Sequence, residues 1–191
     1  MKIYISFDAQ THITTIFAHD GLSQELSYIR ERLQETCLLP LTIHPLLLLV
    51  FILETMVKVE VSRVEEYYRE AISRLPPFAE GGIIPLRDVN IEQESRGALF
   101  LTHRCDYSSL CLEILQSALV TLVVWCMECD STFMTEKHKL AFEDAGKIIC
   151  HRLQNLLSTV RGADRLLRTT KAYNEVFRQS VCTFLTHSLP A

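Results

Sequence analysis

The sequence predicts a mainly α-helical fold of long antiparallel helices, a helical bundle or stalk, with a small N-terminal β-hairpin. Apolar residues between Phe142 and Phe184 recur at alternating steps of four and three residues, which keeps them on one side of a helix. A similar stripe follows Pro45. The chain has 191 residues, 48% hydrophobic and 22% charged, which excludes global disorder and predicts a single helical domain, 1–191.

The N-terminal residues predict two short strands. Lys2–Phe7 places Ile3, Ile5 and Phe7 on one face, and His12–Phe17 is rich in Thr and Ile. Alternation of this kind is typical of extended chain, so we expect a hairpin.

Two helices are expected next. Leu22–Thr36 has apolar residues at helical spacing and ends before Pro40. Pro45 suits the first turn of a helix, because its missing N–H donor costs nothing there, and the pattern continues to Leu75. Prolines and glycines then predict an irregular connecting loop over about 77–97.

The last two predicted helices run from about Tyr107 to Cys129 and over 135–187. The second is one long terminal helix or a helix pair, and Gly146 and Gly162 are the positions where it is expected to bend. In the first, the residues expected to face inward are Leu110, Ile114, Leu115, Ala118, Leu122 and Trp125.

The stripe of the terminal helix predicts a packing or self-association surface, because a long apolar stripe needs a partner helix. Its members are Phe142, Ile149, Leu153, Leu156, Val160, Ala163, Leu167, Phe177 and Val181. The stripe is typical of a coiled coil, and we expect a homo-oligomer or a helix-mediated protein partner. If this helix is instead buried against the helix after Pro45, the protein should be a monomer.

One cysteine motif is a weak candidate for metal or redox chemistry. Cys126 and Cys129 form a C-x-x-C pair that could bind zinc if further ligands followed, or act as a dithiol. His138, the Cys150–His151 pair and His103 with Cys105 could complete a site, but none has finger-like spacing. Buried free cysteine behaves as a small hydrophobe, so core packing is the favoured interpretation.

No motif points to an enzyme or a cofactor. A Gly-x-Ser-x-Gly nucleophile motif is missing, and Gly81-Gly82 lacks the Lys-Ser/Thr sequel of a phosphate loop. His44 is most simply a residue at a helix start. The mixed charges after Pro45 predict a solvated helix face, with Glu54 as the one acid near the apolar stripe.

Charge and cysteine content narrow the partners and the compartment. The net charge is -4 with scattered Lys and Arg, which argues against nucleic-acid binding. Seven cysteines form an odd set, and no secretory signal precedes them, so we expect an intracellular, cytoplasmic protein.

Two apolar stretches could meet lipid, and they give an alternative membrane-associated function. Cys37–Val59 is interrupted by Pro40 and Pro45, and Leu110–Met127 by Glu113. About twenty apolar residues are needed to cross a bilayer, so neither is expected to span one.

Three segments, in this order, resemble the fungal group of CorA-like (magnesium-transporter-like) proteins. They are Tyr4-Ile-Ser-Phe-Asp with Thr14-Thr15-Ile16-Phe17 after it, His44-Pro45-Leu46-Leu47-Leu48 opening a long helix, and Tyr173-Asn174-Glu175-Val176-Phe177-Arg178-Gln179 late in the terminal helix.

The resemblance implies an architecture in which long cytoplasmic helices lead into two membrane spans, with a Gly-Met-Asn motif at the end of the first span. This chain contains no Gly-Met-Asn. We therefore expect a soluble portion without the pore: a truncated relative, a diverged paralogue, or a subunit that meets the membrane through a full-length relative. The expected function is a non-enzymatic helical interaction or oligomerisation module, not a divalent-cation transporter by itself.

Overall fold

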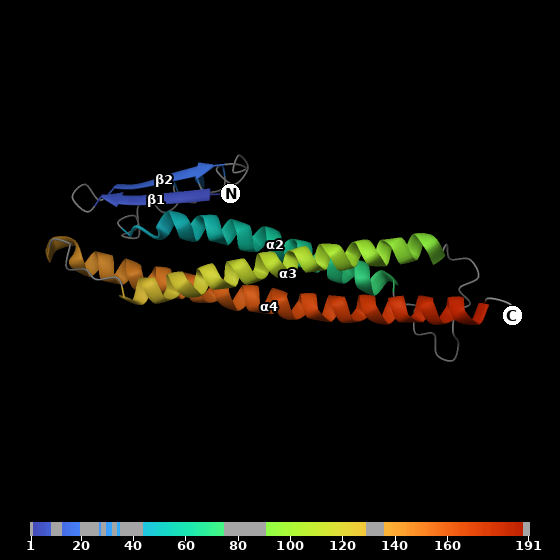
Figure 1. Cartoon of the computed structure of the whole chain (residues 1–191). Helices are drawn as coiled ribbons and strands as arrows, with labels where there is room; N and C mark the ends of the chain where they lie inside the picture. The colour runs from blue at the N-terminus through green and yellow to red at the C-terminus, as the bar shows by residue number, and fades with distance from the viewer. Residues whose placement is uncertain are drawn as a thin grey trace. The chain divides into compact units, whose positions relative to one another are not determined.

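The computed structural model of the chain describes residues 2–8, 13–19, 27, 30–31, 34, 44–74, 91–128 and 136–188. Its elements in chain order are strands β1 (Lys2–Asp8) and β2 (Ile13–His19) and helices α2 (Leu47–Arg74), α3 (Ile91–Glu128) and α4 (Glu136–Ser188) (Figure 1). The predicted mainly α-helical fold with long helices is confirmed.

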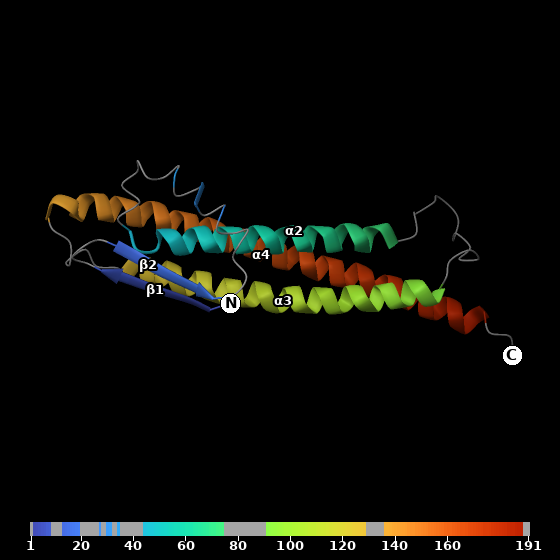
Figure 2. The ribbon, with the colours of Figure 1, turned by 90° about the horizontal axis from the view of Figure 1, so that it is seen from above.

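The two N-terminal strands pair as an antiparallel hairpin (Figure 2). Tyr4 lies opposite Phe17 and Ile5 opposite Ile16. Both strands are rich in aromatic and β-branched residues, whose β propensity favours extended chain, so the alternating pattern folds as a hairpin. Of the helix predicted at Leu22–Thr36, only four residues lie among those described, and all four are helical: Ser27, Arg30, Glu31 and Gln34.

Helix α2 begins just after Pro45, as its sequence predicts. The Leu47 N–H donates to the carbonyl of His44 over 3.1 Å, which closes the first turn around the proline. Pro45 has no N–H, and none is needed at this position. The helix ends at Arg74, and residues 75–90 lie outside the described part of the chain.

Helix α3 begins at Ile91, so the prediction of an irregular connection as far as residue 97 was wrong at its end. Glu92 and Glu94 lie in the first turn, where the helix dipole favours acids. Gly97 does not interrupt the helix. A Cβ at this position would lie 2.7 Å from Nη2 of Arg74, so the guanidinium of this α2 residue lies against Gly97.

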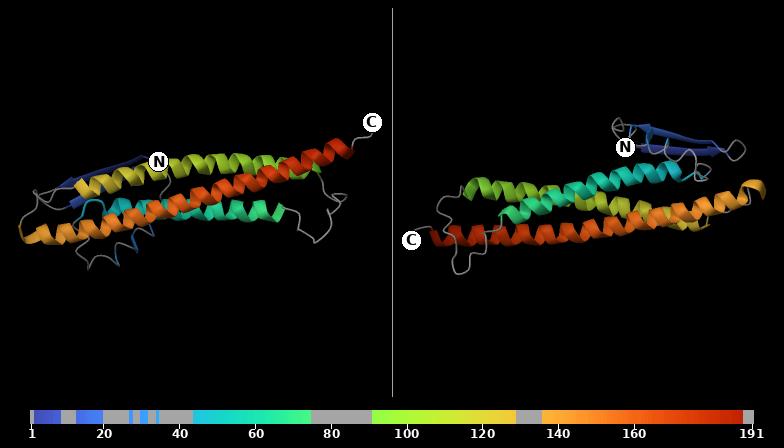
Figure 3. Two further views of the ribbon diagram at one scale, coloured as in Figure 1. Left: turned by 90° about the horizontal axis from the view of Figure 1, so that it is seen from below. Right: turned by 180° about the vertical axis from the view of Figure 1, so that it is seen from behind.

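Helix α4 runs without a break over both of its glycines (Figure 3). A helical glycine costs up to about 1 kcal/mol relative to alanine. The long buried stripe on α4 outweighs this cost, so the helix continues through Gly146 and Gly162. One helix, Glu136–Ser188, therefore occupies the predicted range 135–187.

The chain divides into two compact units, and each of the three helices contributes one segment to each unit. The first unit comprises Met1–Val59 and Leu115–Thr159, and the second comprises Glu60–Ile114 and Val160–Ala191. Within each unit the α3 segment runs opposite to the α2 and α4 segments (Figure 1). The expected organisation as a single domain stays a prediction.

The first unit has a strongly apolar core. Around the start of α2, four successive side chains are buried: Val50, Phe51, Ile52 and Leu53. A helix that is apolar on all sides belongs in an interior, which explains why this part of α2 reads as a continuous hydrophobic run. The other helices of this unit contribute buried Leu115, Leu119, Phe142, Ala145, Ile149 and Leu153.

The second unit has polar groups inside its core. Asn174 of α4 is buried and donates from Nδ2 to the Ala98 carbonyl and to Oγ1 of Thr102, both over 2.9 Å. Arg104 of α3 joins Glu70 of α2 at 2.8 Å. A single polar residue at a core position of a helix bundle fixes register, and Asn174 is placed to fix α4 against α3.

We expect Asn174→Asp to destabilise the protein by about 2–3 kcal/mol at pH 7, because a carboxylate cannot donate to the Ala98 carbonyl. Burial beside acceptors raises the folded-state pKa of the new carboxyl above its unfolded value near 3.9. The penalty is therefore absent below about pH 4 and grows as pH rises from there. Urea unfolding at several pH values measures it. Asn155→Asp, at an exposed site on α4, is the control, and an equal effect of the two variants would contradict the assigned role.

Candidate functional site

The structure places the predicted interaction stripe of α4 inside the protein. Apart from Ala163, the stripe has eight predicted members, of which Leu156 is half-buried and the other seven are buried: Phe142, Ile149, Leu153, Val160, Leu167, Phe177 and Val181. Ala163, in the same stripe, is buried too, and the side chain of Phe184 lies outside the described residues. The stripe packs within the chain, so it offers no free surface, and the self-association role given to it is corrected.

Helix α3 carries two apolar stripes, and the prediction chose the wrong one for the interior. The buried stripe is Ala98, Leu101, Cys105, Ser108, Leu112, Leu115, Leu119 and Cys126. Leu110, Ile114 and Trp125 point outward instead, although Leu115 is buried as expected. Small residues at Ala98, Cys105 and Ser108 let neighbouring helices approach closely, which favours this face for packing.

In the second unit the other stripe forms an exposed apolar surface, here called the outer α3 face: Leu99, Phe100, Tyr107, Leu110 and Ile114. From Phe100 through His103 and Tyr107 to Ile114 the steps alternate between three and four residues. That is the spacing of a helix that packs against another helix. In the first unit, α3 also exposes Val120, Val124, Trp125 and Met127.

Helix α3 as a whole is apolar enough for a membrane location to be considered. Among the helices described, Glu92–Glu128 is the one whose length and composition would allow it to cross a bilayer, and 22% of its most apolar window is buried. Core helices of water-soluble proteins pass the same test, so this finding alone does not place α3 in lipid.

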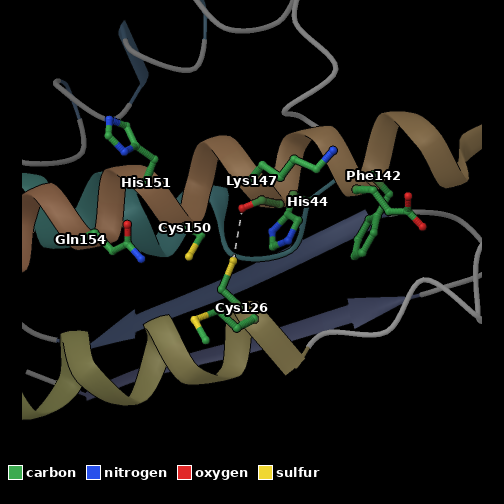
Figure 4. Close-up of a pocket in the computed structure, with 10 residues that line it drawn as sticks. His44, Cys126, Phe142, Lys147, Cys150, His151 and Gln154 are labelled. Atoms are coloured by element: carbon green, nitrogen blue, oxygen red, sulfur yellow. Dashed lines mark hydrogen bonds between the residues drawn. The ribbon is translucent and has the colours of Figure 1, made fainter.

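The first unit contains a pocket of about 490 Å³ between the start of α2, the end of α3 and the first half of α4 (Figure 4). His44 lies inside it. Met127 and Phe142 give it apolar walls, and Lys147 and His151 lie along its α4 side. We call it the His44 pocket.

His44 was correctly predicted as a helix-start residue, but no sequence pattern indicated its surroundings. Its ring is buried and stacks on Phe142 with 4.9 Å between centroids. The Leu46 N–H donates to Nδ1 over 3.3 Å, so the neutral ring carries its proton on Nε2. Burial lowers the pKa of His44 from 6.5 to about 4, which keeps the ring neutral near pH 7.

The Nε2–H group of His44 is a buried donor without a hydrogen-bond partner among the described residues. Leaving such a donor unsatisfied costs about 1–3 kcal/mol. Gly146 of α4 lies beside it, and a Cβ at position 146 would be 3.5 Å from Nε2.

The cysteine candidates are partly brought together. Cys126, Cys150 and His151 all line the His44 pocket, but the Cys126 thiol donates to the Gly146 carbonyl over 3.4 Å. His151 Nε2 accepts from the Asn155 amide over 3.2 Å. In the described ranges no three His, Cys, Asp or Glu residues are grouped as a metal site would require. Cys129 and the side chain of His138 lie outside the described residues.

The two residues of the alternative pair, His103 and Cys105, lie in different environments. Cys105 is fully buried and His103 is exposed. Burial raises the pKa of the Cys105 thiol to about 11, so this cysteine stays protonated and unreactive. Its position in the inner stripe of α3 makes it a packing residue.

The charged face of α2 also differs from expectation at one position. Glu60, rather than Glu54, occupies a buried place in the apolar stripe. Its Oε2 accepts from Arg63 over 3.1 Å, and Oε1 has no partner in the described part of the chain. One acid of the predicted solvated face therefore lies in the core.

Three comparisons with known proteins gave no match: the chain fits no protein-family model, resembles no curated protein sequence, and resembles no solved structure.

Proposed function

We propose that this chain is a non-enzymatic helical interaction module that self-associates through the outer α3 face. The observation that supports the proposal is the helix-packing spacing of exposed Phe100, Tyr107, Leu110 and Ile114. Single exposed apolar residues are common, but a contiguous exposed row is typical of an interaction surface. The face replaces the α4 stripe as the site of association, because the stripe is already buried.

Charge complementarity favours a second copy as the occupant. In an antiparallel pair of outer α3 faces, Leu110 of each copy can meet Phe100 of the other. The same register brings Arg96 of each copy toward Glu113 of the other, one pair at each end. Among the described residues Arg96 pairs with Glu92, and both side chains are exposed, so the guanidinium is accessible.

The acid nearest the middle of the face is already neutralised within its own chain. Asp106 pairs with Lys171 of α4 over 2.9 Å, so two copies can approach without repulsion between their Asp106 carboxylates. Lipid is the less favoured occupant. Insertion of the apolar stretch Leu110–Met127 in a bilayer would place the carboxylate of Glu113 in hydrocarbon.

We expect the full chain to sediment as a dimer at about 100 µM and Leu110→Glu to sediment as a monomer, with at least tenfold weaker association. In the antiparallel register this substitution places a carboxylate against Phe100 of the other copy, and the burial of that charge against an apolar side chain accounts for the loss. Val176→Glu is the matched control, since Val176 on α4 and Leu110 are each 55% exposed, and it should remain dimeric. Unfolding of both variants in urea checks that the fold is intact.

Charge reversal tests the register. Arg96→Glu and Glu113→Arg should each weaken the dimer, and the double variant should recover it. A wild-type chain that stays monomeric at 100 µM would contradict self-association. Recovery of the protein only with detergent, and flotation with phosphatidylcholine vesicles, would favour the alternative membrane-associated function.

Other expectations from the sequence remain proposals. Long helices are compatible with kinship to the soluble portion of CorA-like transporter proteins, but they do not single out that family. A thiol or zinc function through Cys126 and Cys129 has less support, because the Cys126 thiol is engaged with Gly146. An intracellular location follows from the odd set of cysteines.

A further inference from the structure

We propose that the His44 pocket binds a small, uncharged, apolar molecule through a carbonyl oxygen that accepts from Nε2–H of His44. This is independent of the proposed self-association, because the pocket and all its lining residues belong to the first unit. Two observations lead to it: a pocket of about 490 Å³ and an unpartnered buried donor in its lining.

The size and walls of the pocket select an apolar ligand. Its volume is within the range of small-molecule sites, roughly 300–1,000 Å³. Phe142 and Met127 supply apolar surface, and the aromatic ring of His44 stacks on Phe142 at 4.9 Å. A ligand with a ring or a short hydrocarbon body fits such walls.

The Nε2–H donor of His44 determines which polar group the ligand should carry. Because Nδ1 of His44 accepts from the Leu46 N–H, Nε2 carries the proton and requires an acceptor. The Cys126 thiol already donates to the Gly146 carbonyl, so it does not need an acceptor from the ligand. One hydrogen-bond donor in an apolar pocket matches one carbonyl oxygen.

The charges around the pocket favour a neutral ligand over a carboxylate. The cation that lines it, Lys147, pairs with Asp144 over 2.9 Å, and Glu143 lies beside it. The neutral His44 ring carries no positive charge, and at this rim the two acids, Asp144 and Glu143, outnumber the one lysine, so the rim does not attract an anion. A buried carboxylate would therefore be poorly compensated.

Gly146 makes room for the ligand's oxygen. A methyl group at position 146 would lie 3.5 Å from Nε2, in ordinary contact, and would occupy the space that an acceptor needs. The position is inside α4, where alanine is a better helix former than glycine. Gly146→Ala should therefore stabilise the protein and at the same time prevent ligand binding.

The experiment uses acetophenone and ethylbenzene, which differ only in the carbonyl group, titrated into the full chain and followed by NMR. We expect acetophenone to bind about tenfold more tightly, as one hydrogen bond predicts, and to shift the imidazole Nε2–H resonance of His44. Gly146→Ala should weaken acetophenone binding at least tenfold while raising the thermal midpoint.

Gly162→Ala is the matched control, because Gly162 is in the same helix with nothing within 4 Å of a Cβ. It should raise the thermal midpoint and leave binding unchanged. His44→Phe, which keeps the aromatic ring but lacks the donor, should equalise the two affinities. Equal affinities in the wild type, binding that survives Gly146→Ala, or no saturable binding at millimolar acetophenone would overturn the proposal. Octanoate binding more tightly than acetophenone would overturn the choice of an uncharged ligand.

Discussion

Phe51→Ala is expected to cost about 3–5 kcal/mol of unfolding free energy, the usual cost of removing a buried aromatic ring. Phe51 is fully buried in the first unit, and its neighbours Val50 and Ile52 are buried too. The Arg152 guanidinium lies 5.8 Å from the ring centroid, so its loss also removes a cation–π contact. Urea unfolding at pH 7 should show the loss, and the thermal midpoint should fall by about 10 °C.

Phe100→Ala supplies the control for the same change of side chain. Phe100 is 62% exposed on the outer α3 face, so its removal should alter the stability of the monomer by less than about 0.5 kcal/mol. The same variant should weaken the proposed dimer. If Phe51→Ala proved as mild as Phe100→Ala, α2 would not be packed in the core as the structure has it.

Acidification should destabilise the protein through His44 by about 2 kcal/mol at pH 5 and about 3 kcal/mol at pH 4. Burial lowers the folded-state pKa of His44 from 6.5 to about 4, so the unfolded chain binds the proton more tightly. Stability is therefore complete above pH 6.5 and is lost as pH falls toward 4. Urea midpoints between pH 7.5 and 4 measure the loss.

Other groups titrate over the same pH range, so the contribution of His44 is measured as the difference in stability between the wild type and a variant that lacks the imidazole. His44→Phe keeps an aromatic ring against Phe142 and removes the ionisable group. The wild type should lose stability more steeply than this variant between pH 6.5 and 4, by about 3 kcal/mol in total. Parallel curves for the two proteins would show that His44 is not buried as a neutral ring.

A bound carbonyl ligand should oppose this loss. Protonation of Nδ1 breaks the bond from the Leu46 N–H and disturbs the pocket, whereas a ligand that binds only the folded protein stabilises it by mass action. The pH dependence and the binding experiment thus examine the same ring through separate measurements.

Much of the fold follows from local sequence patterns. The stripe from Phe142 to Val181 predicts α4, because residues three and four apart share one side of a helix whatever surrounds it. Pro45 marks the start of α2 for an equally local reason, the missing N–H. The facing strands at the N-terminus follow from alternation. Such features depend on neighbours along the chain, and the chain alone specifies them.

Three features depended on contacts between helices. On α3 two stripes compete, and periodicity cannot tell that Ser108 faces inward while Leu110 faces outward. That the guanidinium of Arg74 in α2 lies against Gly97 of α3 does not follow from either segment alone. Glu60 resembles its solvated neighbours in sequence, yet it lies in the core beside Arg63.

The sequence by itself determined that the chain folds into long helices, where most of them begin and end, and that one stripe of α4 must be covered. Only the tertiary structure decided what covers that stripe, which face of α3 remains exposed, and that His44 meets Phe142 and Gly146 around a pocket. The physical reason is range: helix periodicity arises from residues within one turn, whereas a free surface and a pocket arise from side chains about a hundred residues apart.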